Sequence, residues 1–485
     1  MNIIPDLKTA TPNYWCSWLT QNEVSKLNYE DNGDKTIAFL GDQGAQKARN
    51  LLNENALFGE IGLVYQFPEV RKHLFFMLDD GWDVDYDIHP TNSISSFGSL
   101  SLSKERFPSC KGDDGERLKT LNDMIKKEGW RGLGIWVCAQ KAGNDYDAPF
   151  ENNENLYNYW KDRVLMSKKA GVTYWKVDWG VHCQNENFRK MLTDLGKELY
   201  PELIIEHASC HLPINGDYQN GKFRFTDNDW GKDKFKAIAS ISDVFRSYDV
   251  TDPLSVTTTL DRVCYLLSLC TKSIINCEDE LYMGAVLGCS VGVMRSKYAN
   301  PKIDEVIATI RWQQIAPAFN KGTLITSTEI KYDQHVYQDN DTWYGEILGK
   351  KVTQGAPKIV ARNLPLPKII DGENSPYVLL SQNPNGIVSI GAINSSSEKG
   401  KTEIPPTVEL DLDNPKYIGV FGLFTKLIVN LKDVPKKAYI QSLIKGDAVQ
   451  LNINKNQIEV TLETLEKLHL STDGSQSAVI IKIEY

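Results

Sequence analysis

Eight short apolar segments, most of them separated by stretches with helical character, constrain the fold of this chain more than any other feature. The segments are 14–18, 74–78, 132–138, 174–180, 203–208, 241–246, 273–276 and 290–295. Apolar residues within 118–125 recur at helical spacing, and Gly129 then ends that helix. Strands that alternate with helices predict a parallel sheet, and eight such units predict a (β/α)8 TIM barrel over residues 1–340.

Two helices near the end of the predicted barrel complete the pattern. The gap between the seventh and eighth segments is short and leaves room only for a compact helix around residues 280–287. Residues 303–319 have the apolar spacing of a longer helix, which we expect to be the last of the barrel.

The texture of the chain changes after about residue 340. Proline and glycine become frequent, and short apolar runs follow one another without helices between them, at 377–381, 387–391, 417–421 and 478–483. Short strands bounded by turns predict a C-terminal antiparallel β-sandwich over residues 341–485. No tryptophan follows Trp343, and we therefore expect this domain to pack against its surroundings rather than to offer aromatic platforms to a sugar.

Composition excludes several classes of partner. The formal net charge is −9 and no cluster of Lys or Arg occurs, which argues against nucleic acid and anionic membrane surfaces. No apolar run reaches the length of a transmembrane helix. The first residues lack the apolar core of a signal peptide, so we expect a cytoplasmic protein, or a periplasmic or secreted one whose signal has been removed.

The nine cysteines form no Cys-x-x-Cys pair, so neither a zinc ribbon nor thioredoxin chemistry is indicated. We expect mostly buried thiols, with one disulfide as the alternative. No metal or organic cofactor is indicated, and the oligomeric state is left open.

Acidic side chains gather where the predicted strands end. In a barrel of this kind the chemistry lies at the C-terminal ends of the strands. The candidates at or near those ends are Asp79, Asp80, Trp82, Trp136, Lys176, Asp178, Glu206, His207, Arg246 and Asp249, together with Trp18 after the first segment. Carboxylates accept hydrogen bonds from hydroxyl groups and indole rings cover C–H faces, so this mixture favours a polyhydroxylated ligand such as a sugar.

Glycoside cleavage usually needs two carboxyl groups, and the sequence offers a pair. Lys176 and Asp178 lie two residues apart and therefore point to the same side of a strand. We expect Lys176 to hold Asp178 ionised as a nucleophile. Asp249 is the candidate acid/base, and its pKa would have to be raised for that role. Arg246 would orient the substrate or a water molecule.

Other interpretations of these residues stand beside the catalytic one. A single strand-end Asp is often a helix cap, and Lys176 with Asp178 could be a structural ion pair. His207 and His211 lack recognisable metal-ligand spacing, and Asp83, Asp85 and Asp87 only begin a calcium-loop pattern. Lys176 could also form a Schiff base, although a neighbouring carboxylate favours its charged ammonium form.

Several of these stretches resemble the α-galactosidases of glycoside hydrolase family 27, which is related to family 36. The resemblance spans residues 12–295. It rests on Leu-Asp-Asp-Gly-Trp at 78–82, Tyr-Trp-Lys-Val-Asp at 174–178 and Phe-Arg-Ser-Tyr-Asp at 245–249, with Arg-Phe-Pro at 106–108, Gly-Leu-Gly-Ile-Trp at 132–136 and Tyr-Trp-Cys-Ser-Trp at 14–18 as weaker matches.

The resemblance implies a retaining exo-glycosidase that acts on oligosaccharides or polysaccharide side chains. Asp178 would be the nucleophile and Asp249 the acid/base. Asp79 and Asp80 would hold the C4 and C6 hydroxyls of a galactose-like sugar, and Lys176 would contact the C3 hydroxyl. The family's strand-five loop is replaced here by a different sequence at 206–211, and Cys16 stands where an asparagine is usual.

These departures leave the identity of the sugar open. β-L-Arabinopyranose, α-N-acetylgalactosamine and fucose-like sugars are alternatives to α-galactose, and a transglycosylase could use the same machinery. A sugar-binding barrel without catalytic activity is a further alternative.

Overall fold

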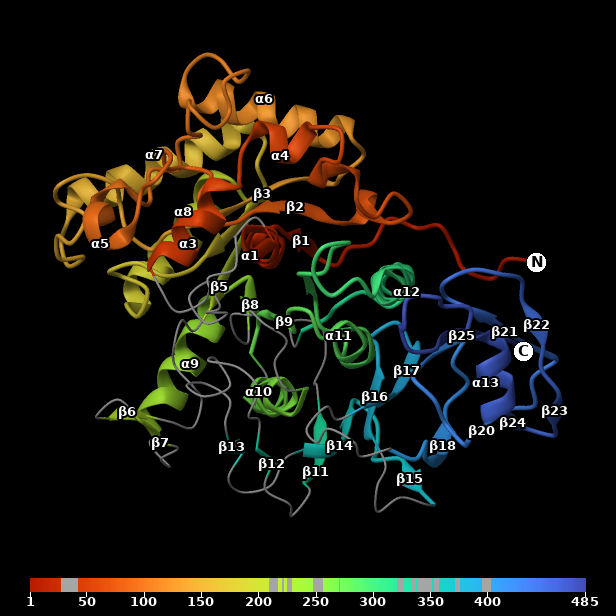
Figure 1. Ribbon diagram of the computed structural model, residues 1–485. Helices are drawn as coiled ribbons and strands as arrows, with labels where there is room; N and C mark the ends of the chain where they lie inside the picture. Colours follow the sequence, from red (N-terminus) through yellow and green to blue (C-terminus); the bar gives the residue numbers. More distant parts are fainter. Residues whose placement is uncertain are drawn as a thin grey trace. The chain divides into compact units, whose positions relative to one another are not determined.

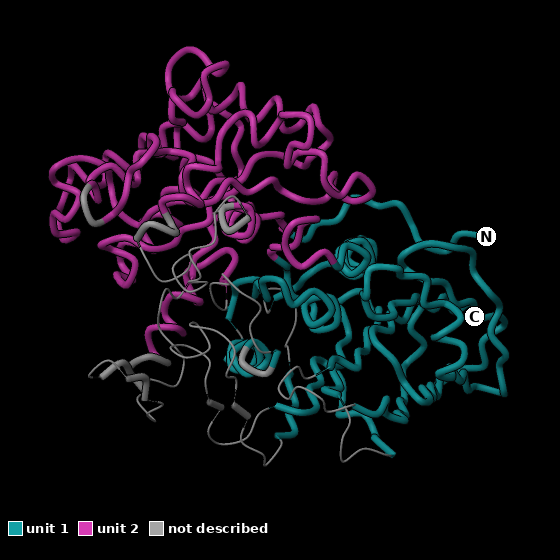
Figure 2. Tube along the Cα trace, in the orientation of Figure 1, with its two compact units in different colours: residues 1–11, 253–291, 302–485 teal, residues 12–252, 292–301 magenta. Residues whose placement is uncertain are grey.

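The computed structural model describes most of the chain, and its residues fall into two compact units (Figure 2). The described residues are 1–27, 42–208, 217–219, 222–224, 229–246, 256–269, 271–320, 327–332, 337–338, 351–352, 357–370, 376–394 and 403–485. One unit comprises residues 12–252 and 292–301, and the other comprises residues 1–11, 253–291 and 302–485.

Eight parallel strands form the first sheet, and their order confirms the predicted (β/α)8 barrel (Figure 1). The order in the sheet is β10-β1-β2-β3-β4-β5-β8-β9. A parallel bridge from Asn276 to Ser290 brings β9 beside the segment that leads into β10, so the barrel is nearly closed. The strands are β1 Tyr14–Cys16, β2 Phe75–Leu78, β3 Gly132–Val137, β4 Tyr174–Val177, β5 Ile204–Ala208, β8 Val244–Arg246, β9 Ile274–Asn276 and β10 Gly292–Val293.

Most residues of these strands are apolar because both faces of the sheet are buried, and the charged residues of the site, such as Lys176 and Arg246, are the exceptions. One face of β1, β2 and β4 contributes Tyr14, Phe75 and Tyr174 to a shared apolar cluster. The opposite face of β1 and β2 carries Trp15 and Phe76, whose ring centroids lie 5.0 Å apart. Alternation along each strand therefore separates the interior of the barrel from its outer layer.

Helices connect most of the strands. They are α1 Trp18–Leu27, α3 Asp42–Asn50, α4 Glu54–Phe58, α5 Pro90–Ser93, α6 Asp114–Lys127, α7 Glu154–Ala170, α8 Glu186–Leu199, α9 Asp229–Ile241, α10 Val256–Leu269, α11 Leu281–Leu287 and α12 Ile303–Gln313. Of these, α6, α11 and α12 lie at the three positions where a helix was predicted. The helix expected at 303–319 ends at Gln313, earlier than predicted. None of the described helices is both long and apolar enough to cross a membrane.

The C-terminal β-sandwich consists of two sheets that share one apolar core. An eight-stranded sheet has the order β11-β14-β16-β17-β19-β25-β21-β22, and a five-stranded sheet has the order β15-β18-β20-β24-β23. Val378 and Val420 of the larger sheet and Val429 of the smaller one belong to the same core cluster. The prediction that all strands pair antiparallel is wrong in part, because β14–β16, β17–β19 and β18–β20 are parallel pairs.

The described strands of this region include the four apolar runs recognised in the sequence and several further strands. They are β11 Thr328–Tyr332, β14 Pro357–Arg362, β15 Lys368–Ile369, β16 Tyr377–Gln382, β17 Val388–Ile393, β18 Thr407–Leu412, β19 Tyr417–Phe421, β20 Lys426–Leu431, β21 Lys437–Ser442, β22 Val449–Gln450, β23 Ile453–Asn454, β24 Gln457–Thr461 and β25 Ala478–Glu484. A short helix, α13 Leu462–Leu468, interrupts them, and the pairs β6–β7 (Asp217–Gln219, Lys222–Arg224) and β12–β13 (Tyr337–Gln338, Lys351–Val352) are separate hairpins.

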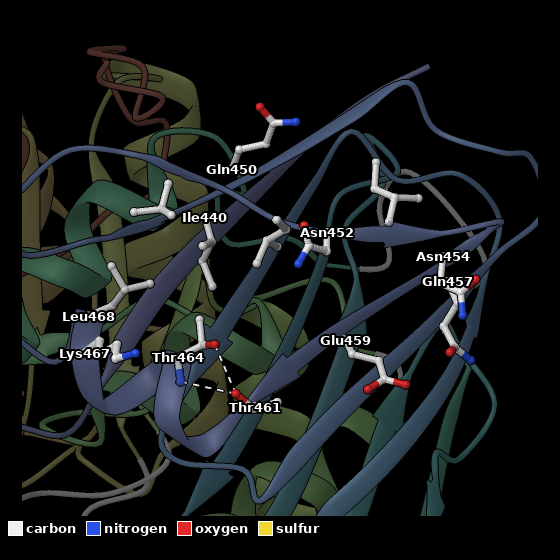
Figure 3. A pocket seen from close by; sticks show the side chains of 13 residues that line it. Ile440, Gln450, Asn452, Asn454, Gln457, Glu459, Thr461, Thr464, Lys467 and Leu468 are labelled. Carbon is white, nitrogen blue, oxygen red and sulfur yellow. Dashed lines mark hydrogen bonds between the residues drawn. The ribbon is translucent and has the colours of Figure 1, made fainter.

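A hollow of about 610 Å³ opens on the sandwich beside β24 and α13 (Figure 3). Its lining mixes aliphatic side chains such as Ile440 with carboxamides such as Asn452 and Asn454. All of its residues lie between 440 and 468, so it includes none of the predicted catalytic or sugar-binding residues.

Candidate active site

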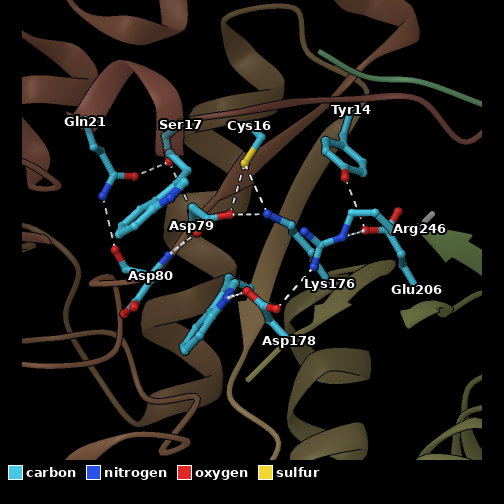
Figure 4. Close-up of polar contacts among 12 residues, drawn as sticks. Tyr14, Cys16, Ser17, Gln21, Asp79, Asp80, Lys176, Asp178, Glu206 and Arg246 are labelled. Atoms are coloured by element: carbon cyan, nitrogen blue, oxygen red, sulfur yellow. Dashed lines mark hydrogen bonds and ion pairs between the residues drawn. The ribbon is translucent and has the colours of Figure 1, made fainter. Parts of the chain in front are cut away.

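Six of the predicted charged residues of the barrel lie together at the C-terminal ends of its strands, namely Asp79, Asp80, Lys176, Asp178, Glu206 and Arg246 (Figure 4). In the sheet register, Trp136 of β3 pairs with Lys176 of β4, and Lys176 pairs with Glu206 of β5. These side chains therefore start from one level of the barrel. The charged and aromatic residues of the site belong to the unit made of residues 12–252 and 292–301.

Lys176 forms an ion pair with Asp79 across the interior of the barrel. Its Nζ lies 2.6 Å from Asp79 Oδ2, and both side chains are almost completely buried. Asp79 Oδ2 also accepts a hydrogen bond from the Cys16 thiol at 3.0 Å. The expectation that Lys176 holds Asp178 ionised stays a prediction. Residues two apart in a strand start almost 7 Å from each other, whereas the long Lys176 side chain reaches across the interior.

Asp178 is held through its backbone and through both carboxylate oxygens. Its backbone N–H donates to the Val137 carbonyl at 2.9 Å. The Trp136 Nε1–H donates to Asp178 Oδ2 at 3.0 Å, and Arg246 Nη2 lies 3.3 Å from Oδ1. Arg189 Nη2 donates to the Asp178 carbonyl oxygen at 3.1 Å. The carboxylate is therefore fixed in direction at the mouth of the barrel.

Arg246 is positioned by a carboxylate that lies beside it. Its Nε is 3.3 Å from Glu206 Oε1, and both side chains are fully buried. The Tyr14 hydroxyl donates to Glu206 Oε1 at 3.1 Å, and the Tyr174 hydroxyl donates to Oε2 at 2.8 Å. Glu206 was predicted to contact the sugar. In this geometry its carboxylate contacts Arg246, Tyr14 and Tyr174, and its contact with the sugar stays a prediction.

Asp80 has a cationic partner from outside the barrel strands. Arg49 Nη2, from the last turn of α3, donates to Asp80 Oδ2 at 2.6 Å. The Asp80 backbone N–H donates to Asp79 Oδ1 at 2.8 Å, which fixes the Asp79 carboxylate against the neighbouring backbone. Burial raises the pKa of Asp80, and the Arg49 guanidinium only partly opposes that shift.

The tryptophans of the site form a buried layer. The Trp82 Nε1–H donates to the Trp136 carbonyl oxygen at 2.9 Å, and neither side chain is exposed. Trp179 is half-buried, and its ring centroid lies 5.4 Å from that of Trp136. Trp18 is half-buried against the interior cluster of the barrel. Sugar contacts by Trp18, Trp82 and Trp136 remain predictions.

His207 occupies the opposite face of β5 from Glu206. Its Nδ1 lies 3.1 Å from Arg189 Nη1 and its Nε2 lies 2.9 Å from Thr193 Oγ1, both of α8. The side chain is fully buried, and burial together with the neighbouring Arg189 lowers its pKa well below the usual value. The predicted sugar contact of His207 is therefore corrected, since strand alternation turns this side chain away from the interior.

The remaining predictions for this region concern the second acid, metals and disulfides. Asp249 and His211 lie outside the described residues. Among the residues that the structure describes, no three His, Cys, Asp or Glu side chains are grouped to hold a metal ion. The seven described cysteines are free thiols, six of them buried and Cys183 half-buried, whereas Cys210 and Cys270 lie outside the described part.

Several residues that shape the site carry no signal in the sequence. Arg49 and Arg189 come from helices without a recognisable motif. Tyr14 and Tyr174 could have been identified from alternation, because they lie two residues from Cys16 and Lys176 in their strands. Asp79, Asp80, Asp178 and Glu206 each contact a lysine or an arginine. Together these charged groups offer fixed hydrogen-bond donors and acceptors to a hydroxyl-rich ligand.

No known family model matches this chain, and no curated protein sequence matches it. Similar solved structures include α-galactosidase I from Mortierella vinacea (11% identity, 99% of this chain and 98% of that chain covered, TM-score 0.40). Others are a GH27 β-L-arabinopyranosidase from Geobacillus stearothermophilus (11% identity, 99% and 97% covered, TM-score 0.41) and a putative α-N-acetylgalactosaminidase from Bacillus halodurans (11% identity, 99% of each chain covered, TM-score 0.37). Those activities are the activities of the matched proteins.

Proposed function

We propose that this protein is a retaining glycoside hydrolase that releases a terminal galactose-like sugar from an oligosaccharide or a polysaccharide side chain. The observation that carries the proposal is the orientation of Asp178. A carboxylate at the mouth of a barrel, held by Trp136 Nε1–H at 3.0 Å and Arg246 Nη2 at 3.3 Å, keeps lone pairs on both oxygens for attack on an electrophilic carbon.

The first step would form a covalent intermediate. An Asp178 oxygen attacks the anomeric carbon, and the glycosidic C–O bond breaks with its electron pair going to the leaving oxygen. Asp249 donates a proton to that oxygen, and the aglycone leaves as an alcohol. In the second step Asp249 takes a proton from water, the water oxygen attacks the anomeric carbon, and Asp178 leaves as a carboxylate.

The other buried groups would bind the sugar. Asp79 and Asp80 accept hydrogen bonds from hydroxyl groups, and the Lys176 ammonium donates to sugar oxygens. Galactose, L-arabinopyranose and N-acetylgalactosamine share the hydroxyl arrangement that such a set would bind. The 2.6 Å contact with Asp79 favours the ammonium form of Lys176, which argues against a Schiff-base lyase.

A panel of 4-nitrophenyl glycosides tests the proposal. It should include α-galactose, α-N-acetylgalactosamine, β-L-arabinopyranose, α-fucose and α-glucose, and we expect turnover of a galacto-configured member. Asp178→Asn should reduce kcat by at least about 10⁴-fold, because the nucleophile is lost while the shape is kept. The matched control is Asp243→Asn, at the other end of β8, where Asp243 accepts a hydrogen bond from the Ile205 N–H. Near wild-type turnover by Asp178→Asn would refute the assignment.

The stereochemistry of the product tests the retaining mechanism separately. Proton NMR during early turnover should show the sugar released with the anomeric configuration of the substrate. Asp249→Ala should slow substrates with poor leaving groups far more than nitrophenyl glycosides, since good leaving groups need little protonation. Initial release of the inverted anomer would exclude Asp178 as a covalent nucleophile.

A further inference from the structure

Arg49 brings an unusual combination of charge and burial to the edge of the site. Only 4% of its surface is exposed. Its Nη2 donates to Asp80 Oδ2 at 2.6 Å, but Nε and Nη1 have no hydrogen-bond partner among the described residues. Asp80 Oδ1, the other oxygen of the same ion pair, also lacks one there. The pair therefore presents two donors and one acceptor side by side.

Such groups are rarely left unmatched in a folded protein. A buried N–H or carboxylate oxygen that loses water without gaining a partner is destabilising, and most buried polar atoms are satisfied. Here three unmatched atoms lie on one ion pair, next to the Asp79 that binds Lys176. This concentration is typical of a binding site whose partner arrives with the ligand.

The backbone around Arg49 fixes where its guanidinium lies. Gly81 packs so closely that a Cβ there would come within 2.9 Å of Arg49 Cα. Arg106 Nη1 donates to the Arg49 carbonyl oxygen at 2.6 Å, and the Arg49 guanidinium lies 5.1 Å from the centre of the Phe97 ring. The end of α3 is thus fastened to the loop after β2, which carries Asp80.

We propose that Arg49 is a specificity-determining residue that, together with Asp80, clamps one hydroxyl group of the terminal sugar. The sugar hydroxyl group donates its hydrogen to Asp80 Oδ1. The oxygen of that hydroxyl group accepts a hydrogen bond from Arg49 Nε or Nη1. This inference rests on the proposed glycosidase function and extends it, because it assigns sugar recognition to α3, outside the barrel strands.

The chemistry of the clamp selects a neutral hydroxyl over other substituents. A hydroxyl both donates and accepts, so it satisfies both members of the pair. A carboxylate would meet Asp80, an ammonium group would meet Arg49, and a C–H group would leave all three atoms unmatched. The site should therefore discriminate strongly against the sugar that lacks this one hydroxyl.

The test measures inhibition by free sugars in wild type and in variants. The probes are D-galactose, 4-deoxy-D-galactose, 6-deoxy-D-galactose and L-arabinopyranose, each competing with the best nitrophenyl substrate. In wild type, one deoxy position should weaken binding by more than about tenfold. In Arg49→Met, the inhibition constant of galactose should rise by a similar factor. The inhibition constant of that deoxy sugar should change by less than about threefold, because the deoxy sugar lacks the hydroxyl group that Arg49 would bind.

Two further variants separate recognition from folding. Arg49→Lys should regain part of the discrimination, since an ammonium can donate to one acceptor. Arg131→Met, which removes the cation stacked 4.5 Å from the Phe75 ring near the start of β3, should leave the ratio of galactose to deoxy sugar unchanged. Melting temperatures of all variants show whether each is folded.

Two results would overturn the inference. Equal weakening of all four sugars in Arg49→Met would show that Arg49 only supports the structure. A wild type in which no deoxy position matters would show that no hydroxyl is clamped. Both results are compatible with turnover of the glycoside panel, whereas a wild type that hydrolyses no member of the panel refutes the proposed function itself and this inference with it.

Discussion

At the scale of single residues, the ion pair of Lys176 and Asp79 is almost completely buried in the interior of the site. Lys176→Met should lower the free energy of unfolding by about 3–5 kcal/mol, because it leaves a buried carboxylate without its cation. Urea denaturation measures this loss. Lys190→Met removes a cation from the exposed pair with Asp194 and should change stability by less than about 1 kcal/mol. Equal losses of unfolding free energy in the two variants would show that burial of the Lys176–Asp79 pair does not increase its contribution to stability.

Asp83 predicts a second residue-scale effect, on the pH dependence of stability. It lies just beyond Trp82 with 5% of its surface exposed, and its Oδ2 accepts a hydrogen bond from the Leu100 N–H at 3.1 Å. Burial raises its pKa from 3.8 to about 7. Between these values the folded state holds a proton that the unfolded state releases, so this group's contribution to stability falls as pH rises from about 4 to about 7.

The comparison with Asp83→Asn isolates this effect. The variant cannot ionise at this position, so its stability relative to wild type should increase with pH across that window, by at most about 1.4 kcal/mol per pH unit. Denaturation at pH 5, 6, 7 and 8 measures the difference. A difference that stays constant with pH would mean that Asp83 ionises in the folded protein as it does in water.

The positions of the main charged side chains could be predicted from sequence, but their partners could not. Alternation and strand ends placed Asp79, Lys176 and Asp178 at one end of the barrel. The partner of Lys176 depends on how far its side chain extends across the interior of the barrel. The spacing of residues along one strand carries no information about that distance. The position of His207 near the end of a strand predicts a place in the site, but alternation puts its side chain on the outer face of β5, against α8.

At the scale of secondary structure elements, helix α8 supports the backbone around Asp178. It begins after Asn185, whose side chain accepts a hydrogen bond from the Phe188 N–H at 3.0 Å, and it carries Arg189, which donates to the carbonyls of Val177 and Asp178. Asn185→Ala should lower the free energy of unfolding by about 1 kcal/mol and should also reduce kcat, because the start of α8 loosens.

The cap of α7 offers a matched control for that prediction. Asn153 accepts a hydrogen bond from the Leu156 N–H at 3.0 Å, so Asn153→Ala should cost a similar free energy. Its kcat should remain close to wild type, since no described hydrogen bond runs from the first turn of α7 to Asp178. Chemical denaturation and steady-state kinetics give both values, and equal losses of kcat would attribute the effect to general destabilisation.

Elements were predictable where local pattern and burial agree. All eight barrel strands appear at the predicted segments, because strands buried on both faces leave mostly apolar runs. Helix α13 and the parallel strand pairs of the sandwich were missed. Pairing direction is set by where distant segments meet, and β14 with β16 shows that it can differ from the hairpin pattern expected of neighbours in sequence.

At the scale of the whole molecule, the unit that contains the sandwich also contains residues 253–291 and 302–320. Arg362 of β14 donates to the carbonyls of Leu287 and Phe319 at 2.6 and 2.8 Å, and its guanidinium lies 3.7 Å from the centre of the Phe319 ring. Arg362→Met should therefore lower the free energy of unfolding by about 3 kcal/mol or more, because several buried carbonyl groups lose their donor.

A surface variant on the smaller sheet of the sandwich provides the comparison. Lys368→Met removes a largely exposed cation that lies 3.0 Å from Glu409 and should change stability by less than about 1 kcal/mol. Unfolding followed by intrinsic fluorescence measures both variants. A small loss in Arg362→Met would mean that its carbonyl contacts contribute little.

The prediction of a domain boundary between residues 340 and 341 followed the change in sequence texture. Composition detects where helices stop, but it does not detect which helices pack on the following sheet. Trp312 of α12 illustrates this, because a Cβ at Gly419 of β19 would come within 2.8 Å of its ring. The sequence around Gly419 does not indicate that a glycine is needed there. The need is visible only in the fold, where the Trp312 ring packs against it.

The restraint of Asp178 has a consequence for motion during the proposed reaction. Its backbone N–H, its carbonyl and both carboxylate oxygens all contact residues of the barrel or of α8. A nucleophile anchored at four points cannot travel far toward its target. In the proposed reaction the sugar would then move more than the carboxylate when the new bond forms. The ring would flatten, and its anomeric carbon would approach the stationary Asp178 oxygen while the bound hydroxyl groups hold the rest of the ring in place.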